Sequence, residues 1–225
     1  MSINQEIIIL GAGGHGKELA SYIHDLVSRG EKLSLLGFVD DNKPKGPFAD
    51  SRILGGFKEL PNLLSSNSCI HYITAAGDDA LRMDFVKKIE ALHMKNLKAW
   101  TLRHPQTYVG QEVAIGEGTC LCPGSVITTH VRIGVHCIVN VNVSVSHDVT
   151  VGDFTNLNPG VRICGNVEIG ESCYIGAGAT VIDKIKIGKG TIIGAGAVVT
   201  EDIPEDVTAV GVPAKITKKH GALTH

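Results

Sequence analysis

The stretch VGQEVAIGEGTCLCPGSVITTHVRIGVHCIV, residues 109–139, carries an aliphatic side chain at every sixth position, and this pattern continues without a break to Val199. A six-residue period drifts out of phase with the turn of an α-helix, whereas it is the signature of a parallel β-helix built from hexapeptide repeats. We expect each repeat to supply one strand and one turn, and three repeats to close a triangular coil of about 18 residues. The aliphatic positions are Val109, Ile115, Leu121, Ile127, Ile133, Val139, Val145, Val151, Leu157, Ile163, Ile169, Ile175, Val181, Ile187, Ile193 and Val199.

The register of the repeats is unbroken between residues 109 and 199, which leaves no room for a long loop extruded from the β-helix. An active site on such a scaffold has to use its outer faces, and long regular faces suit packing in a cyclic trimer. We therefore expect the site in a groove between two copies, with the N-terminal domain covering it.

The composition supports a narrow prism and excludes some partners. Of the 225 residues, 43% are hydrophobic but only 4% are aromatic, which suits a core of small branched side chains. The formal net charge is -2 without a basic block, so no binding to nucleic acid is expected. The six cysteines lack paired CxxC spacing, which favours buried thiols in a reduced compartment over metal ligands or disulfides. The N-terminus has neither a signal-peptide pattern nor a membrane span, so a cytoplasmic protein is expected.

The first hundred residues alternate short apolar runs with helical patterns, which predicts a small Rossmann-like α/β domain with a parallel sheet. Strands are expected at residues 7–10, 35–39, 70–76 and 99–102, and helices at 17–28, near 57–64 and at 81–94. The sixfold pattern takes over near Pro105, which also disfavours helix for His104. The predicted parts are an α/β domain (1–103), a β-helix domain (104–200) and a C-terminal tail (201–225).

A glycine-rich turn joins the first expected strand to the first expected helix. Gly11, Gly13 and Gly16 form GxGxxG there, and Asp40 ends the second expected strand. Such a turn lets backbone N–H groups approach a pyrophosphate, and the acid can hold a ribose hydroxyl. In this context we favour nucleotide binding over a tight structural turn. About 100 residues make only one mononucleotide-binding half, so a single nucleotide or nucleotide-sugar is expected. Whether His15 contacts the ligand or faces solvent stays open.

Histidines within the repeats stand outside the inward positions, so they should face outward or lie at turns: His130, His136 and His147. His147 is followed by Asp148, and at a coil corner that carboxylate could orient the imidazole as a general base. A surface histidine without a role is the commoner case when such a residue is judged alone. Gly165 lies 18 residues further on, one coil up, where its N–H could receive a developing oxyanion.

Five segments together resemble the sugar acyltransferases of the sialic acid O-acetyltransferase type. They are most similar to nucleotide-amino-sugar N-acetyltransferases, such as those acting on UDP-4-amino sugars and GDP-perosamine. The segment with His147 and Asp148 inside hexapeptide repeats is the most specific, whereas the glycine turn alone would not distinguish the family. The segments are GAGGHG (11–16), GFVDD (37–41), AGDDALR (76–82), SHDVTVGDF (146–154) and VGVPAK (210–215).

The resemblance implies a left-handed β-helix in a homotrimer, with acetyl-CoA as co-substrate in the groove between adjacent prisms and no metal. It makes His147 the general base, Asp148 its partner, and Asn140 a residue near the site. The implied nucleotide-sugar contacts are Gly13, Gly14, His15, Asp40, Asp41 and Gly77. The implied acetyl-CoA contacts, largely through backbone groups, are Asn156, Gly165, Ala177 and Ala195. Some members have a second histidine where this chain has Asn156, so a proton-transfer role at that position is lost here.

The expected function is acetyl-CoA-dependent N-acetylation of a nucleotide-linked amino sugar, a 4-amino-4,6-dideoxy sugar by resemblance. We expect direct transfer, with His147 as base, backbone N–H groups at the oxyanion and no covalent intermediate. O-acetylation of sialic acid or another sugar hydroxyl is the main alternative. A β-helix carbonic anhydrase is disfavoured, because the spacing of the three histidines does not match its zinc site. A nucleotide-sensing trimeric scaffold is the non-enzymatic alternative.

Overall fold

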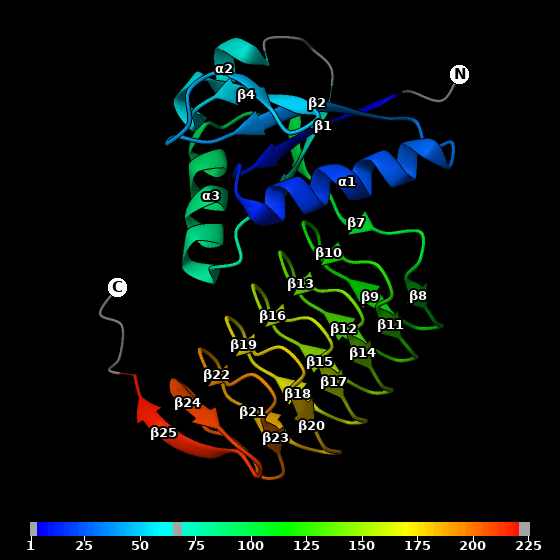
Figure 1. Cartoon of the computed structure of the whole chain (residues 1–225), viewed down its shortest axis with the longest axis vertical. Coiled ribbons are helices and arrows are strands. Elements are labelled where there is room, and N and C mark those ends of the chain that lie inside the picture. Colours follow the sequence, from blue (N-terminus) through cyan, green and yellow to red (C-terminus); the bar gives the residue numbers. More distant parts are fainter. Residues whose placement is uncertain (1–3, 65–68, 221–225) are drawn as a thin grey trace. The chain divides into compact units, whose positions relative to one another are not determined.

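The computed structural model describes residues 4–64 and 69–220 and divides into two compact units, Met1–Trp100 and Thr101–His225 (Figure 1). The division lies three residues before the position expected from the sequence. The reason is that β7 (Leu102–Arg103) already pairs with β10 (Cys120–Leu121) as part of the second unit. No helix among the described residues has the length and apolar character needed to cross a membrane.

The first unit is an α/β domain around a six-stranded sheet in the order β3-β4-β2-β1-β5-β6, parallel except for the β3–β4 pair. The strands are β1 (Gln5–Leu10), β2 (Leu33–Val39), β3 (Gly46–Phe48), β4 (Ser51–Gly55), β5 (Ile70–Thr74) and β6 (Leu97–Ala99). The helices are α1 (Gly14–Ser28), the 3₁₀ turn η1 (Phe57–Glu59), α2 (Leu60–Leu63) and α3 (Asp79–Ala91). The expected α/β architecture is confirmed, but β3 and β4 were not predicted, because short strands in a Gly- and Pro-containing segment lack a readable period.

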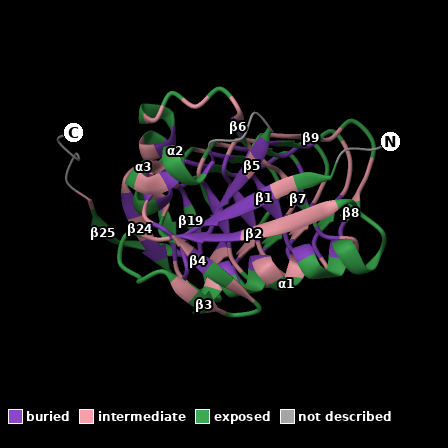
Figure 2. Ribbon diagram, turned by 90° about the horizontal axis from the view of Figure 1, so that it is seen from above, coloured by how far each residue is buried: buried purple, intermediate pink, exposed green. Residues whose placement is uncertain are grey.

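Burial on both faces explains why β1 reads as an unbroken apolar run. Ile7, Ile8, Ile9 and Leu10 are fully buried, and Figure 2 shows β1 and β5 within the buried interior. The amphipathic helix α1 packs on β1 and β2 through the buried side chains of Leu19, Ile23 and Leu26. The opposite face packs against Phe57, Leu60, Phe85 and Ile89.

The second unit is a parallel β-helix, as expected, in which the strands from β7 to β23 pair with one another one 18-residue coil apart, such as Cys120 with Ile138. Three sheets result, here called B, C and D. Sheet B contains β7 (Leu102–Arg103), β10 (Cys120–Leu121), β13 (Ile138–Val139), β16 (Asn156–Leu157), β19 (Tyr174–Ile175), β22 (Ile192–Ile193), β24 (Val207–Val210) and β25 (Lys215–Lys219). Sheet C contains β8 (Tyr108–Val109), β11 (Val126–Ile127), β14 (Ser144–Val145), β17 (Arg162–Ile163), β20 (Thr180–Val181) and β23 (Val198–Val199). Sheet D contains β9 (Ala114–Ile115), β12 (Arg132–Ile133), β15 (Thr150–Val151), β18 (Glu168–Ile169) and β21 (Lys186–Ile187).

Two edges border sheet C, and each consists of stacked turns. The turns at 140–142, 158–160, 176–178 and 194–196 lead from sheet B to sheet C and are called the alanine edge. The turns at 128–130, 146–148, 164–166 and 182–184 lead from sheet C to sheet D and are called the histidine edge. Consecutive turns on one edge lie one coil apart, so residues 18 apart in sequence stack.

The interior of the prism contains the repeat aliphatics together with small side chains two residues before them. Where these smaller side chains are polar, they are satisfied: the Thr119 hydroxyl donates to the Gly134 carbonyl (2.8 Å) and accepts from the Cys137 N–H (3.0 Å). Buried hydroxyls with both functions used incur little desolvation penalty. The aliphatic core therefore tolerates them.

The segment from residue 201 onward, predicted as a tail, is structured through residue 220. β24 extends sheet B parallel to β22, and β25 returns antiparallel to β24. Val207 and Ala209 join the prism core, so the segment caps its end. Residues 221–225 of the predicted tail lie outside the described residues.

Candidate active site

A histidine–aspartate pair stands on the histidine edge in the turn after β14. The His147 Nδ1 and Asp148 Oδ2 atoms are 2.8 Å apart, and both side chains are about half exposed. Neighbouring residues on a flat strand would point to opposite faces. Asp148 has a left-handed backbone (φ 58°), a conformation that aspartate tolerates, and this turns its carboxylate towards the preceding imidazole. With Nδ1–H donated to Asp148, the Nε2 lone pair is available to accept a proton.

Gly165 lies against the imidazole of His147 from the next coil. A Cβ atom placed on Gly165 would be 2.5 Å from Cε1 and 2.7 Å from Nε2 of His147. Both distances are far shorter than van der Waals contact, so a side chain at residue 165 would push the half-exposed imidazole out of this position. Glycine at 165 therefore lets the imidazole of His147 lie against the next coil.

Two residues beside this pair were missed from the sequence. Asp183 stands one further coil up, and its Oδ1 accepts a hydrogen bond from the Gly165 N–H (3.2 Å). Cys164 precedes Gly165; burial raises the pKa of its thiol, and the nearby Asp183 carboxylate raises it further. Repeating the 18-residue step from Gly165 would have found Asp183. The Gly165 N–H, expected to face an oxyanion, is donated to Asp183 here.

The expected acetyl-CoA contacts other than Gly165 do not lie beside His147. Ala177 and Ala195 are exposed and stack on the alanine edge, where Gly196 N donates to the Ala177 carbonyl (2.8 Å). Asn140 lies on the same edge, with its Oδ1 accepting from Val141 N–H (2.7 Å). Asn156 begins β16 in sheet B and is only 3% exposed. Within one chain, sheet C separates these residues from His147, a path of roughly 20 Å along the strand direction at about 3.3 Å per residue.

The other two histidines of the repeats occupy separate environments. His130 is on the histidine edge and its Nδ1 lies 2.8 Å from the Thr129 hydroxyl. His136 is buried between sheets D and B and stacks on Phe154, with ring centroids 5.3 Å apart. The described residues contain no group of three or more His, Cys, Asp or Glu side chains that could hold a metal ion.

In the α/β unit, the strand register brings the expected nucleotide contacts to one end of the sheet. Leu10 of β1 pairs with Val39 of β2 and with Thr74 of β5, so the loops after all three strands are neighbours. Cβ atoms placed on Gly13, Gly14 or Gly77 would meet no atom within 4 Å. Neither packing nor a left-handed backbone requires glycine at these three positions, and their open surroundings leave room for a ligand to approach the backbone.

Asp40 holds the glycine turn in place. Its Oδ2 accepts from the Ala12 N–H and its Oδ1 from the Asn42 N–H, both at 2.9 Å. Each carboxylate oxygen keeps a second lone pair, so a ribose or base hydrogen-bond donor can still be accepted. Gly16 permits the tight turn, because a Cβ there would lie 2.5 Å from the Gly11 carbonyl oxygen.

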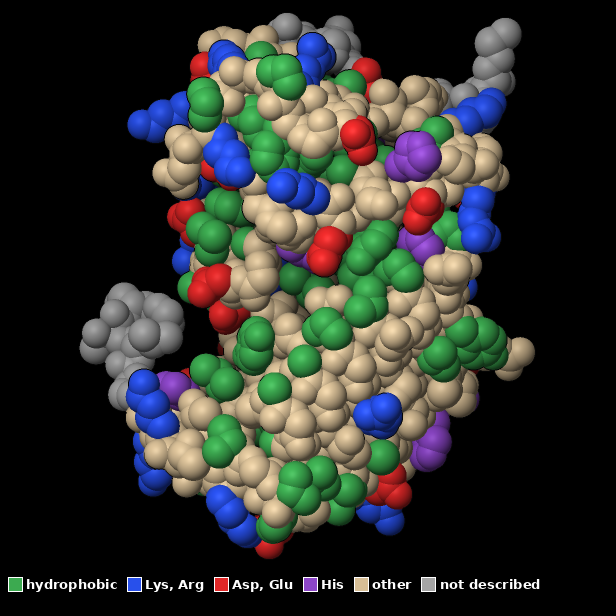
Figure 3. Space-filling model, in the orientation of Figure 1, with side chains coloured by type: hydrophobic (Ala, Val, Ile, Leu, Met, Phe, Trp, Pro, Cys, Tyr) green, Lys and Arg blue, Asp and Glu red, His purple; other side chains and the backbone are tan. Residues whose placement is uncertain are grey.

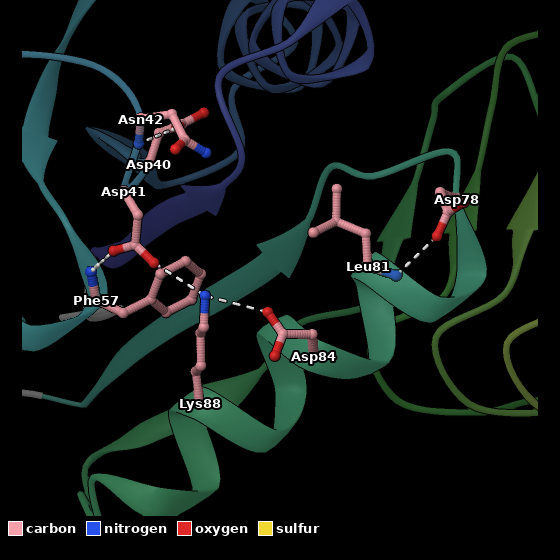
Figure 4. A network of polar contacts seen from close by, with 8 residues as sticks. All are labelled: Asp40, Asp41, Asn42, Phe57, Asp78, Leu81, Asp84 and Lys88. Carbon is pink, nitrogen blue, oxygen red and sulfur yellow. Dashed lines mark hydrogen bonds and ion pairs between the residues drawn. The ribbon is translucent and has the colours of Figure 1, made fainter. Parts of the chain in front are cut away.

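Asp41 points to α3 instead (Figure 4). Its Oδ2 pairs with Lys88 Nζ (2.9 Å) and its Oδ1 accepts from Phe57 N–H (3.0 Å). The hydrogen bond from Lys88 holds the pKa of Asp41 below its ordinary value. Lys88 also pairs with Asp84 (3.1 Å), so Asp41 ties the end of β2 to α3.

Two further side chains fix the loops around the expected nucleotide contacts. Arg82 is fully buried and donates to the Ala76 carbonyl (2.6 Å), which supports the loop containing Gly77. His15 Nδ1 lies 2.9 Å from Glu18 Oε2, and this hydrogen bond lowers the pKa of Glu18. The imidazole of His15 therefore points along α1 towards Glu18, and 14% of its side chain is exposed.

A glycine-turn α/β unit joined to a hexapeptide β-helix with a His–Asp pair defines a hexapeptide acyltransferase, and comparison with known proteins specifies the family. Residues 6–89 match the model of the PglD N-terminal domain, and residues 166–201 match that of bacterial transferase hexapeptide (six repeats). The acetyltransferase domain of PglB from Neisseria gonorrhoeae is 31% identical with a TM-score of 0.84, over 95% of this chain and all of that domain. The chain belongs to the PglD-type hexapeptide acetyltransferases.

Two perosamine enzymes are also similar. PerB from Caulobacter crescentus, solved in complex with CoA and GDP-perosamine, is 32% identical with a TM-score of 0.82, over 95% of this chain and 97% of that one. A GDP-perosamine N-acetyltransferase of Escherichia coli is 29% identical over 156 residues, 65% of this chain and 64% of that protein. The predicted family, fold class and acetyltransferase activity are confirmed.

Proposed function

We propose that this chain transfers the acetyl group of acetyl-CoA to the amino group of a nucleotide-linked 4-amino-4,6-dideoxy sugar, with His147 as the general base. The single observation that carries the proposal is the His147–Asp148 pair packed under Gly165 in a chain of this family. The structure of PerB in complex with CoA and GDP-perosamine supports acetyl-CoA and a nucleotide-linked amino sugar as the two substrates.

The reaction requires one proton acceptor and no covalent intermediate. The neutral sugar amine attacks the thioester carbonyl carbon, and His147 Nε2 takes the proton that the nitrogen sheds. Asp148 stabilises the imidazolium through Nδ1–H. The tetrahedral intermediate expels the CoA thiolate, which takes a proton from the imidazolium, so the enzyme returns to its starting state. A cysteine nucleophile is not needed, and the raised pKa of Cys164 makes its thiolate scarce at neutral pH.

The oxyanion of the intermediate needs a donor. The Gly165 N–H remains our candidate, but its hydrogen bond to Asp183 has to be exchanged for the oxyanion when acetyl-CoA binds. The distance of 3.2 Å between Gly165 N and Asp183 Oδ1 is at the long end of the range for N–H···O hydrogen bonds. Asp183 thus holds the amide in place between turnovers.

A trimer would bring the two edges of sheet C together. Sheet C exposes Tyr108 and Val126 together with one charged side chain, Arg162, whereas sheet D exposes the charged side chains of Glu168 and Lys186. On the face of the β-helix shown in Figure 3, small groups of hydrophobic side chains are scattered among polar side chains and backbone, and most charged side chains lie towards its margins. With sheet C facing a threefold axis, the histidine edge of each copy meets the alanine edge of the next. The groove between them then holds His147 on one side and Ala177 and Ala195 on the other.

The alanine edge suits the co-substrate. Gly176, Ala177, Gly194 and Ala195 present backbone and small side chains, along which the pantetheine arm of acetyl-CoA can lie close to N–H and C=O groups. The glycine turn and Asp40 of the α/β unit bind the nucleotide.

The test mixes the full-length protein with acetyl-CoA and a panel of GDP-, UDP- and dTDP-linked 4-amino sugars, and follows free thiol release. Matched sugars with a hydroxyl in place of the amine serve as controls. We expect turnover with at least one amino sugar and none with its hydroxyl counterpart. Turnover with hydroxyl sugars alone, or with no acceptor of the panel, would contradict the proposal.

A further inference from the structure

Three residues near the nucleotide end of the α/β unit have no part in the site described so far: Lys17, Lys43 and Phe48. Lys17 lies in the first turn of α1, Lys43 follows β2, and Phe48 ends β3. The Lys43 Nζ lies 4.4 Å from the centroid of the Phe48 ring, and the Lys17 Nζ lies 5.5 Å from the same centroid. Two ammonium groups from separate segments therefore converge on one aromatic ring.

The ring of Phe48 is held next to the glycine turn. It packs edge-on against Phe38 of β2, with centroids 5.0 Å apart and planes at 82°. Phe38 in turn approaches Gly16, since a Cβ built there would lie 3.5 Å from its Cε1 atom. The two lysines are thus placed beside the turn that precedes α1.

Among the described residues, the ammonium groups of the two lysines have no carboxylate partner. In the described part of the chain, neither Lys17 nor Lys43 forms an ion pair with a carboxylate, whereas Lys45 pairs with Glu59 and Lys88 with Asp41. Asp40 is nearby in sequence, and its oxygens accept the backbone N–H groups of Ala12 and Asn42; among the described residues it forms no ion pair with either lysine. Two like charges gathered without a counterion create a positive potential that favours an anion.

We propose that Lys17 and Lys43 bind the diphosphate of the nucleotide-sugar, with Phe48 holding both side chains in place; this rests on the proposed function. A diphosphate accepts charge-assisted hydrogen bonds from several ammonium groups at once. The open space beside Gly13 and Gly14, and the absence of acidic residues from the first turn of α1, leave room for it. Acetyl-CoA also contains a diphosphate, but these lysines neighbour Asp40 and the glycine turn, where the nucleotide is placed.

The test is titration calorimetry of the full-length protein with GDP, UDP and dTDP and with the corresponding nucleosides. We expect Lys17→Met and Lys43→Met each to weaken binding of the preferred nucleoside diphosphate about tenfold, and roughly a hundredfold together. Nucleoside binding should not change. Phe48→Leu should weaken diphosphate binding about threefold, since it removes only the support of the ammonium groups. Lys32→Met, an exposed lysine before β2 at the opposite strand end, is the matched control and should bind normally.

Steady-state kinetics distinguishes binding of the nucleotide-sugar diphosphate from binding of the acetyl-CoA diphosphate. The double variant should raise the KM for the nucleotide-sugar and leave that for acetyl-CoA unchanged, and Lys17→Arg with Lys43→Arg should restore most of the affinity. Wild-type affinity for the diphosphate in the Lys17→Met, Lys43→Met variant, or a raised KM for acetyl-CoA alone, would overturn the inference. A wild-type protein that binds no nucleoside diphosphate would instead refute the proposed function, and the lysine site with it.

Discussion

The two edges of sheet C are built from the same 18-residue coils but carry opposite chemistry. The histidine edge presents ionisable groups in successive turns, namely His147, Asp148, Cys164 and Asp183. The alanine edge presents Gly176 and Ala177 in the same coil as Asp183, and Gly194 and Ala195 one coil higher. One edge can move protons but has little to hold a long flexible ligand, whereas the other can hold such a ligand and has no titratable group. Under the proposed function, neither edge of a single chain makes a complete site.

This contrast explains why the repeat register has to be kept so strictly. A single inserted residue would shift every turn above it, and His147 would no longer lie under Gly165. In the proposed trimer, regularity on both edges would let the reactive groups of one copy face the acetyl-CoA-binding edge of another at a fixed height. The scaffold would then set the distance between proton acceptor and acetyl donor.

The largest expected effect falls on the histidine edge. His147→Ala should lower kcat by about 10²–10⁴-fold with little change in either KM, because a general base contributes that much and binds neither substrate. Single-turnover thiol release measures it. His130→Ala, one coil below on the same edge, is the control and should be near normal. A His147→Ala variant with ordinary turnover would refute the base assignment.

Gly165→Ala should cost about 10²-fold in kcat, because the new methyl group displaces the imidazole by around 1 Å from its working position. The double variant Gly165→Ala/His147→Ala should lose no more than His147→Ala alone, since both changes remove the same function. Additive losses would mean that Gly165 acts independently of His147, for example through its N–H at the oxyanion.

A change on the alanine edge should affect binding rather than chemistry. Ala195→Lys should raise the KM for acetyl-CoA about tenfold through steric obstruction of the groove, with kcat at saturation nearly unchanged. Lys186→Ala on sheet D, outside both edges, is the control. A fall in kcat without a change in the KM for acetyl-CoA would contradict the assignment of acetyl-CoA binding to the alanine edge.

The smallest effect is expected at Cys164. Cys164→Ala should keep turnover within about twofold of wild type, because proton transfer belongs to His147 and no covalent intermediate forms. The pKa of the thiol is raised, so the thiolate is scarce below that pKa and becomes abundant only as pH rises through it. Alkylation of Cys164 by iodoacetamide should therefore be slow at pH 7 and accelerate with alkaline pH. Fast alkylation at neutral pH would indicate an activated nucleophile.

Sequence reasoning reached the β-helix in more detail than the α/β unit, for a physical reason. In the coil, neighbours in space lie at a fixed offset in sequence, so the 18-residue step from His147 predicts Gly165 over the imidazole, and Asp183 lies one further step away. In the α/β unit, neighbours come from unrelated segments. Nothing in the sequence shows that Asp40 turns to the glycine turn while Asp41 pairs with Lys88, 47 positions away.

The same limit applies between chains. A single chain places Ala177 and Ala195 on the other edge of sheet C from His147, and the proposed trimer is what would bring the two edges together.

Subunit complementation tests the composite site most directly. His147→Ala and Ala195→Lys chains, carrying different tags, are coexpressed and mixed trimers are assayed at low acetyl-CoA concentration. If the groove lies between copies, each mixed trimer of a threefold ring has one junction with both edges intact, so a random mixture regains about a quarter of wild-type activity. Activity no higher than that of the two parent variants would show that the site lies within one chain and would contradict the shared groove.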